Sequence, residues 1–217
     1  MRVEKLLKRV APMFLIGFVF CTIQATATFG QGGIINEVFA RMDAHNKALT
    51  SLKANVTMVK VNAQLGGAQD TNEGSAIFLP QRGKDALIRI DWKSPKESLA
   101  VVNKQYVIYR PALNQAYTGS TNDAQKKPKA GNALAFMNMS RAQLKQNYDT
   151  VYLGQESVRG GVQTWHLQLT PKAKSNYKTA EIWVDGNGMP VQSKVIENNG
   201  DSTTVLLSGL QKNLKIS

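Results

Sequence analysis

Apolar and polar residues alternate along most of the chain, in short runs separated by turn-forming residues. The clearest example is the segment 85–118, in which four runs rich in β-branched and aromatic residues follow one another. In the first run every second residue is apolar and would share one face of a strand: Ala86, Ile88, Ile90 and Trp92. This pattern predicts an antiparallel meander.

The breaks between these runs carry residues suited to turns. Asn103 and Lys104 separate two runs, and because Asn tolerates positive φ, the pair predicts a tight two-residue hairpin. Pro95 and Pro111 lack a backbone donor, so we expect each at the end of a strand.

The same alternation over the whole chain predicts about eleven strands. They comprise the four runs of 85–118 and the segments 53–65, 73–79, 150–158, 162–170, 179–185, 190–197 and 202–210. In the segment 53–65 the apolar residues occupy even positions up to Met58 and odd positions after it. This change predicts a β-bulge near Met58. So many short strands in some 185 residues must curl or close.

Two segments have a helical pattern and could fill the concave side of the curled sheet. In Ile34–Leu49 apolar residues recur three and four positions apart, and His45 is expected to pack at the edge of that apolar stripe. In Ala133–Asn147 a short apolar segment is followed by Ser140 and Gln143, which fit a capping box.

The first 27 residues have the features of a cleaved signal peptide. A basic start precedes the apolar run Val10–Ile23, which is too short to span a bilayer, and small residues follow it up to Ala27. We expect cleavage after Ala27, with Gln31 as an alternative site, and a single domain over 28–217. The only cysteine, Cys21, lies in this segment after Phe20, which disfavours lipidation. The mature chain would then have no thiol for disulfides, metal sites or catalysis.

Net charge narrows the range of partners. The chain carries +12, and removal of residues 1–27 takes away four basic residues and one acidic residue, which leaves +9. A basic exported protein suggests transient contact with anionic membrane surfaces or acidic proteins, although the charge could serve solubility alone. Export disfavours nucleic acid as a partner.

Catalytic signatures are missing from the sequence. The two histidines, His45 and His166, are about 120 residues apart and belong to no motif, and no zinc, serine-hydrolase or nucleotide fingerprint is present. We therefore expect no metal, no cofactor and no enzymatic activity. A hydrolase built from carboxylates on distant strands stays open as an alternative.

Several short motifs, taken in order, resemble one protein family. They are Ile90-x-Trp92, Pro95, Val101-Val102, Ile108-Tyr109-x-Pro111-x-x-x-Gln115, Trp165–Lys172, Ile182-x-Val184-Asp185, Gly188-Met189-Pro190 and Gly200–Val205. Together they resemble the outer-membrane lipoprotein carriers of the LolA type over most of 34–213. The chain differs from that family in having Asn103-Lys104 in place of Asp-Gly and in a shortened C-terminal extension.

The resemblance implies a fold and a function. The fold would be an unclosed antiparallel β-barrel with a helical lid, LolA/LolB-like, around an apolar cavity. The protein would be a periplasmic monomer that takes acylated lipoproteins or lipids from an inner-membrane export complex to an outer-membrane acceptor. A lipid-sensing envelope regulatory module on the same fold is the alternative.

The expected cavity combines strand and loop residues. Its predicted lining is Val56, Met58, Ile88, Ile90, Trp92, Phe136 and Met137. Methionine side chains adapt to contents of variable shape. By resemblance, Ile90 and Trp92 match the aromatic pair of the family's third strand, and Arg82 is the nearest candidate for its functional arginine, in contact with partner or cargo. We expect Ile90→Glu to reduce bound cargo while the fold stays largely intact.

Overall fold

The computed structural model describes residues 28–81, 86–120, 136 and 139–215. The predicted signal peptide, Arg82 and Met137 lie outside these residues, so the expectations for them stay predictions. Most of the predicted helical segment 133–139 lies outside them as well.

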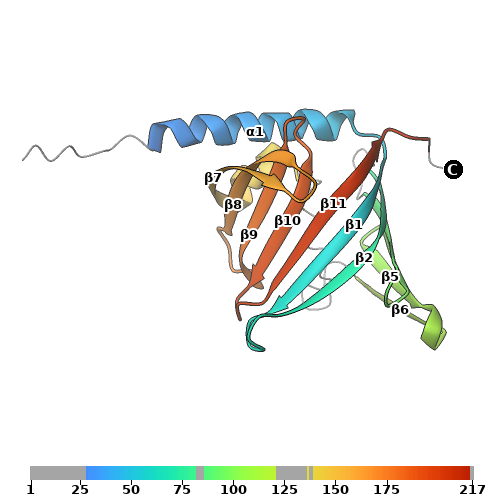
Figure 1. Cartoon of the computed structure of the whole chain (residues 1–217). Helices are drawn as coiled ribbons and strands as arrows, with labels where there is room; N and C mark the ends of the chain where they lie inside the picture. Colours follow the sequence, from blue (N-terminus) through green and yellow to red (C-terminus); the bar gives the residue numbers. More distant parts are fainter. Residues whose placement is uncertain (1–27, 82–85, 121–135, 137–138, 216–217) are drawn as a thin grey trace, which may run out of the picture.

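In the described part of the chain, eleven antiparallel strands form one sheet, as the alternation predicts. Figure 1 shows how the strands are arranged. The elements are α1 (Thr28–Ala48), β1 (Leu52–Asn62), β2 (Ala68–Leu79), β3 (Leu87–Trp92), β4 (Glu97–Val102), β5 (Gln105–Arg110), a 3-10 turn (Pro111–Leu113), β6 (Gln115–Ser120), α3 (Arg141–Asn147), β7 (Tyr148–Val158), β8 (Val162–Pro171), β9 (Tyr177–Asp185), β10 (Pro190–Glu197) and β11 (Ser202–Lys212).

The sheet runs in the order β6-β5-β4-β3-β2-β1-β11-β10-β9-β8-β7, so the first and last strands pair with each other at its middle. β6 and β7 form its two ends, and in the described part of the chain no ladder joins them. The sheet curls, and α1 lies across one end of it (Figure 1). The fold is therefore a mainly β, unclosed barrel with helices at its mouth.

Helix α1 is attached to the sheet by one apolar stripe and one arginine. Val38, Phe39 and Met42 are almost completely buried, which confirms the predicted amphipathic helix. On the exposed side Arg41 pairs with Glu37 at 2.7 Å and donates to the carbonyl of Gly186 at 3.0 Å. The Arg41 guanidinium also lies 5.2 Å from the ring centroid of Trp165. These contacts fix α1 against β8 and the β9–β10 turn.

The predicted capping box is present at the start of α3. The backbone N–H of Gln143 donates to Ser140 Oγ at 3.2 Å, and the backbone N–H of Ser140 donates to Gln143 Oε1 at 2.8 Å. The Arg141 N–H donates to Asp43 Oδ1 at 3.0 Å. This last bond ties α3 to α1.

The predicted turns are confirmed. Asn103 and Lys104 have φ of 48° and 62°, as a two-residue hairpin requires, and Pro111 directly follows the end of β5.

The predicted β-bulge near Met58 is wrong. β1 pairs with β2 without interruption, and the inward residues Leu52, Ala54, Val56 and Met58 keep one parity. The extra residue lies in β11 opposite Ala54, beside Gly209 at φ 58°. Beyond Met58 both faces of β1 are half-buried. Apolar residues are therefore tolerated on either face there, which explains why they change from even to odd positions without a bulge.

Candidate functional site

The described residues of the predicted cavity lie on one face of the sheet. Val56 and Met58 come from β1, and Ile88, Ile90 and Trp92 come from β3. Strand register joins them into rows across the sheet. One row runs Ala54, Ala76, Ile90, Leu99, Ile108, and the next contains Val56, Gly74 and Trp92. The alternation in sequence thus placed the strand residues on a common apolar surface.

Phe136 is also part of this interior. Its side chain is almost completely buried, and its ring centroid lies 6.0 Å from that of Tyr148 at the start of β7. Phe136 therefore packs within the core near the β7 end of the sheet.

The two halves of the sheet bury their inner faces to different degrees. In β8 and β9, Leu167, Leu169, Ile182 and Val184 have no exposed area. In β3–β5, Ile90 and Leu99 are also buried, but Ile88, Val101 and Ile108 pack against the core and stay partly exposed. The accessible apolar area on the inner face of β3–β5 therefore comes from Ile88, Val101 and Ile108.

Sequence reasoning missed inner-face residues on β4 and β5. Leu99 and Tyr106 are buried on the inner face, and the Tyr106 ring occupies the place where a Cβ on Gly119 would lie, at 2.4 Å. The signal was available, because the Asn103-Lys104 hairpin sets the register of β4 against β5. Ile90 pairs with Leu99 between β3 and β4, and the hairpin register carries that position on to Ile108.

His45 is a half-buried residue of α1, consistent with its predicted place at the edge of the apolar stripe. Its Nε2 atom is buried and has no hydrogen-bond partner among the described residues. Burial lowers the pKa of His45, the positive charge of Lys212 lowers it further, and Asp185 partly opposes both. The imidazole is therefore held neutral in the folded protein.

This lowered pKa predicts a loss of stability in acid. Below the ordinary histidine pKa of about 6.5 the unfolded chain binds a proton that folded His45 resists, so the free energy of unfolding falls as pH drops from 7.5 to 5. We expect His45→Gln to reduce that fall, measured by urea unfolding at both pH values. An equal fall in the variant would assign the acid sensitivity to other groups.

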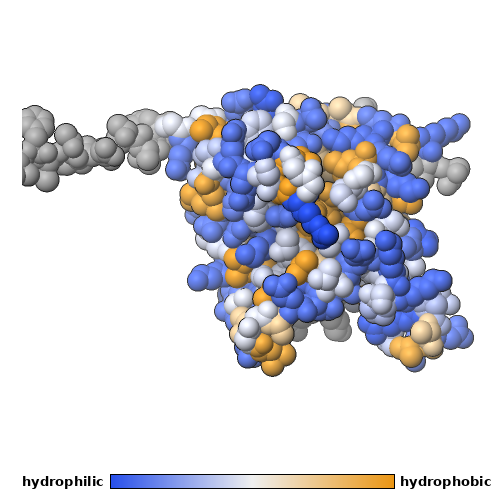
Figure 2. Space-filling view, viewed as in Figure 1, coloured by the Kyte–Doolittle hydropathy of each residue, from blue (hydrophilic) through white to orange (hydrophobic). Residues whose placement is uncertain are grey.

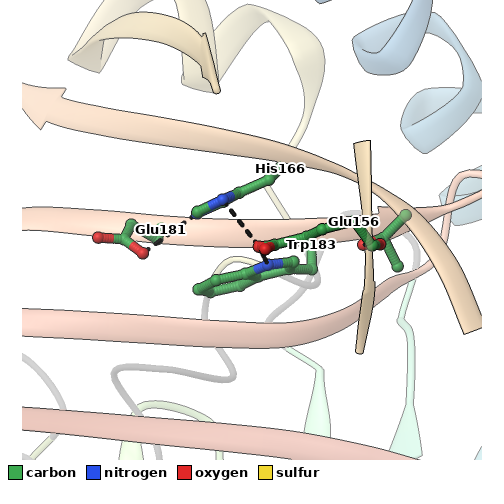
Figure 3. A network of polar contacts seen from close by, with 5 residues as sticks. Glu156, His166, Glu181 and Trp183 are labelled. Carbon is green, nitrogen blue, oxygen red and sulfur yellow. Dashed lines mark hydrogen bonds and ion pairs between the residues drawn. The ribbon is translucent and has the colours of Figure 1, made fainter. Parts of the chain in front are cut away.

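A polar cluster surrounds His166 of β8 (Figure 3). His166 precedes Leu167 in the strand, so it lies on the opposite face of the sheet from that core residue. His166 Nδ1 is 2.9 Å from Glu156 of β7, and its Nε2 is 3.1 Å from Glu181 of β9. The ring stacks on Trp183 at 4.1 Å between centroids, and Trp183 Nε1 donates to Glu156. The cluster joins three neighbouring strands and so strengthens the β7 end of the sheet.

In the described part of the chain, no group of three or more His, Cys, Asp or Glu residues is arranged to hold a metal ion. Within the same residues, neither helix combines the length and apolar character that crossing a membrane would take. The expected absence of a cofactor stays a prediction.

A family model described as outer membrane lipoprotein carrier protein LolA matches residues 63–217. The chain belongs to the LolA family. LolA-family proteins are carriers of lipoproteins rather than enzymes, and the resemblance stated from the sequence motifs is confirmed. None of the curated proteins matches the sequence.

Several solved structures are similar to this chain at low sequence identity. An uncharacterized conserved protein from Thermus thermophilus has a TM-score of 0.51 at 12% identity, covering 83% of this chain and 88% of its own. LprF from Mycobacterium bovis has a TM-score of 0.49 at 12% identity, covering 86% and 96%. A putative outer membrane lipoprotein-sorting protein domain from Vibrio parahaemolyticus has 0.47 at 16%, covering 83% and 93%.

Proposed function

We propose that this LolA-family protein is a periplasmic carrier that shields the acyl chains of lipoproteins and passes them from the inner to the outer membrane. The observation that supports this proposal best is the partly exposed apolar surface of Ile88, Val101 and Ile108 on the inner face of an unclosed sheet. An acyl chain laid on that surface would exchange contact with water for contact with β-branched side chains.

The energetics explain why such a carrier is needed. Each methylene kept from water contributes about 0.8 kcal/mol, so a dozen methylenes amount to roughly 10 kcal/mol per acyl chain. Free diffusion across an aqueous compartment is therefore extremely slow. Transfer becomes feasible when the chain moves from one apolar surface directly to the next, and the carrier must then bind less tightly than the acceptor.

We propose Val56, Met58, Ile88, Ile90, Trp92, Phe136 and Met137 as the lipid-binding lining, with Arg82 as a contact to cargo or partner. Of these, Ile88 offers the sharpest test, because it is partly exposed and adjoins Leu87, a partly exposed residue of opposite parity on the same strand.

The test compares lipid that co-purifies with the mature protein from bacteria, measured by mass spectrometry. We expect Ile88→Asn to lower bound acyl lipid roughly fivefold, because one large apolar contact is lost. The matched variant Leu87→Asn changes the other face of β3 and should retain the wild-type yield. Absence of lipid from the wild type, or equal loss in both variants, would refute the proposal.

A further inference from the structure

A pocket with apolar and hydrogen-bonding groups lies where the C-terminal turn of α1 meets the end of β2. Its volume is about 630 Å³, within the range of ligand-binding pockets. Its lining is Asp43, Asn46, Lys47, Leu49, Thr50, Pro80, Gln81 and Ser140. Leu49 also belongs to the buried core, and most of the pocket's lining surface is apolar, with the side-chain amides of Asn46 and Gln81 among its polar groups.

The charges in the pocket cancel. Lys47 Nζ lies 3.9 Å from Asp43 Oδ2, while Asp43 Oδ1 accepts the N–H of Arg141. With one cation and one anion paired, the described residues of the lining carry no excess positive charge to attract a phosphate or carboxylate. The chemistry favours an uncharged ligand that has both apolar and hydrogen-bonding groups.

Hydrogen-bonding groups remain for such a ligand. Gln81 makes no hydrogen bond to the described residues, and Asn46 uses its amide nitrogen in one long contact, 3.4 Å, to the carbonyl of Met139. These side-chain amides can each donate and accept, as a peptide unit does.

The end of α1 adds acceptors to the same edge. The last helical bond runs from the Leu49 N–H to the carbonyl of His45 at 2.9 Å, and the Thr50 N–H donates to the side chain of Asn213 instead of continuing the helix. The final carbonyls of a helix have no partner within it. Backbone N–H groups of an extended peptide are suitable donors for them.

We propose that this pocket binds the uncharged polypeptide segment that follows the acylated N-terminus of a lipoprotein, while the acyl chains occupy the apolar interior. The inference rests on the proposed carrier function. It assigns cargo recognition to Asn46 and Gln81, and it makes lipoproteins, rather than free lipids, the preferred cargo.

The experiment uses three probes on the mature protein: a triacylated cysteine amide without a peptide, the same group followed by four serines, and phosphatidylglycerol. Affinities are measured by displacement of a fluorescent fatty acid. We expect the serine tail to tighten binding by about tenfold in the wild type, the size expected of one or two hydrogen bonds.

Variants assign this gain to the pocket. Asn46→Leu with Gln81→Leu should abolish the gain from the tail and leave binding of the tail-less probe unchanged. The matched pair Gln69→Leu with Gln155→Leu, at exposed amides elsewhere, should retain the gain. Gln81→Leu alone, at a half-buried position beyond the end of β2, serves if the double variant fails to fold, and should lose part of the gain.

The outcomes separate the two proposals. Failure of both cysteine probes to bind would refute the carrier function. Equal affinity of the two probes in the wild type would overturn the pocket assignment and leave the carrier intact. Binding of phosphatidylglycerol that depends on Asn46 and Gln81 would also overturn it, because the pocket would then recognise a lipid headgroup.

Discussion

Gly188→Ala should lower the free energy of unfolding by about 3 kcal/mol and loosen α1 from the barrel. Gly188 has φ of 82°, a region that residues with a Cβ rarely adopt. A Cβ there would lie 2.3 Å from the carbonyl carbon and oxygen of Arg41 and 2.7 Å from the amide nitrogen of Met42. Those atoms are helix backbone, so α1 itself must move.

The same turn supplies the control. A Cβ on Gly186 meets nothing within 4 Å, so Gly186→Ala should change stability little. Urea unfolding measures both variants, and hydrogen exchange of the α1 amides reports whether the helix is released. Equal stability of the two variants would contradict the view that close packing at Gly188 holds the helix.

Ile90→Glu should destabilise the protein by about 4 kcal/mol, through loss of apolar contacts and burial of an ionisable group. The Ile90 side chain has no exposed area and sits between Ala76 and Leu99 in the inner row. This burial corrects the expectation that the substitution would remove cargo and spare the fold. Loss of lipid in this variant would report unfolding as much as binding.

Two measurements separate lost packing from burial of charge in Ile90→Glu: the stability of Ile90→Val and the pH dependence of the stability of Ile90→Glu. Ile90→Val should cost only about 1 kcal/mol, because it removes one methyl group. Burial raises the pKa of a carboxyl group, so the deficit of Ile90→Glu should shrink as pH falls toward 4 and the group becomes neutral. Urea unfolding at pH 7 and pH 4 measures this, and a deficit independent of pH would assign the loss to packing alone.

Features set by neighbouring residues could be predicted from the sequence, whereas features that depend on contacts between distant residues could not. Local signals sufficed for the Asn103-Lys104 hairpin and the Ser140 capping box, because each is set by a few consecutive residues. Alternation placed Val56 and Trp92 on one face. The β11 bulge was missed because it depends on pairing between the two ends of the chain.

The candidate pocket could not be predicted from sequence for the same reason. Asn46 and Gln81 are 35 positions apart and have no shared motif, and they line one pocket only because α1 crosses the sheet near the end of β2. The degree of burial was equally inaccessible: parity assigns Ile88 and Ile90 to one face, but it does not distinguish the partly exposed residue from the fully covered one.

The ladder between β1 and β11 has a consequence for how the protein acquires its structure. β2–β6 and β7–β10 can each assemble from strands that follow one another in the chain, whereas the central ladder joins residues about 150 positions apart. Contacts of such long sequence separation form slowly, since a large loop must close first. The two halves of the sheet are therefore expected to form early, and the seam that unites them is made only once the last strand has been synthesised.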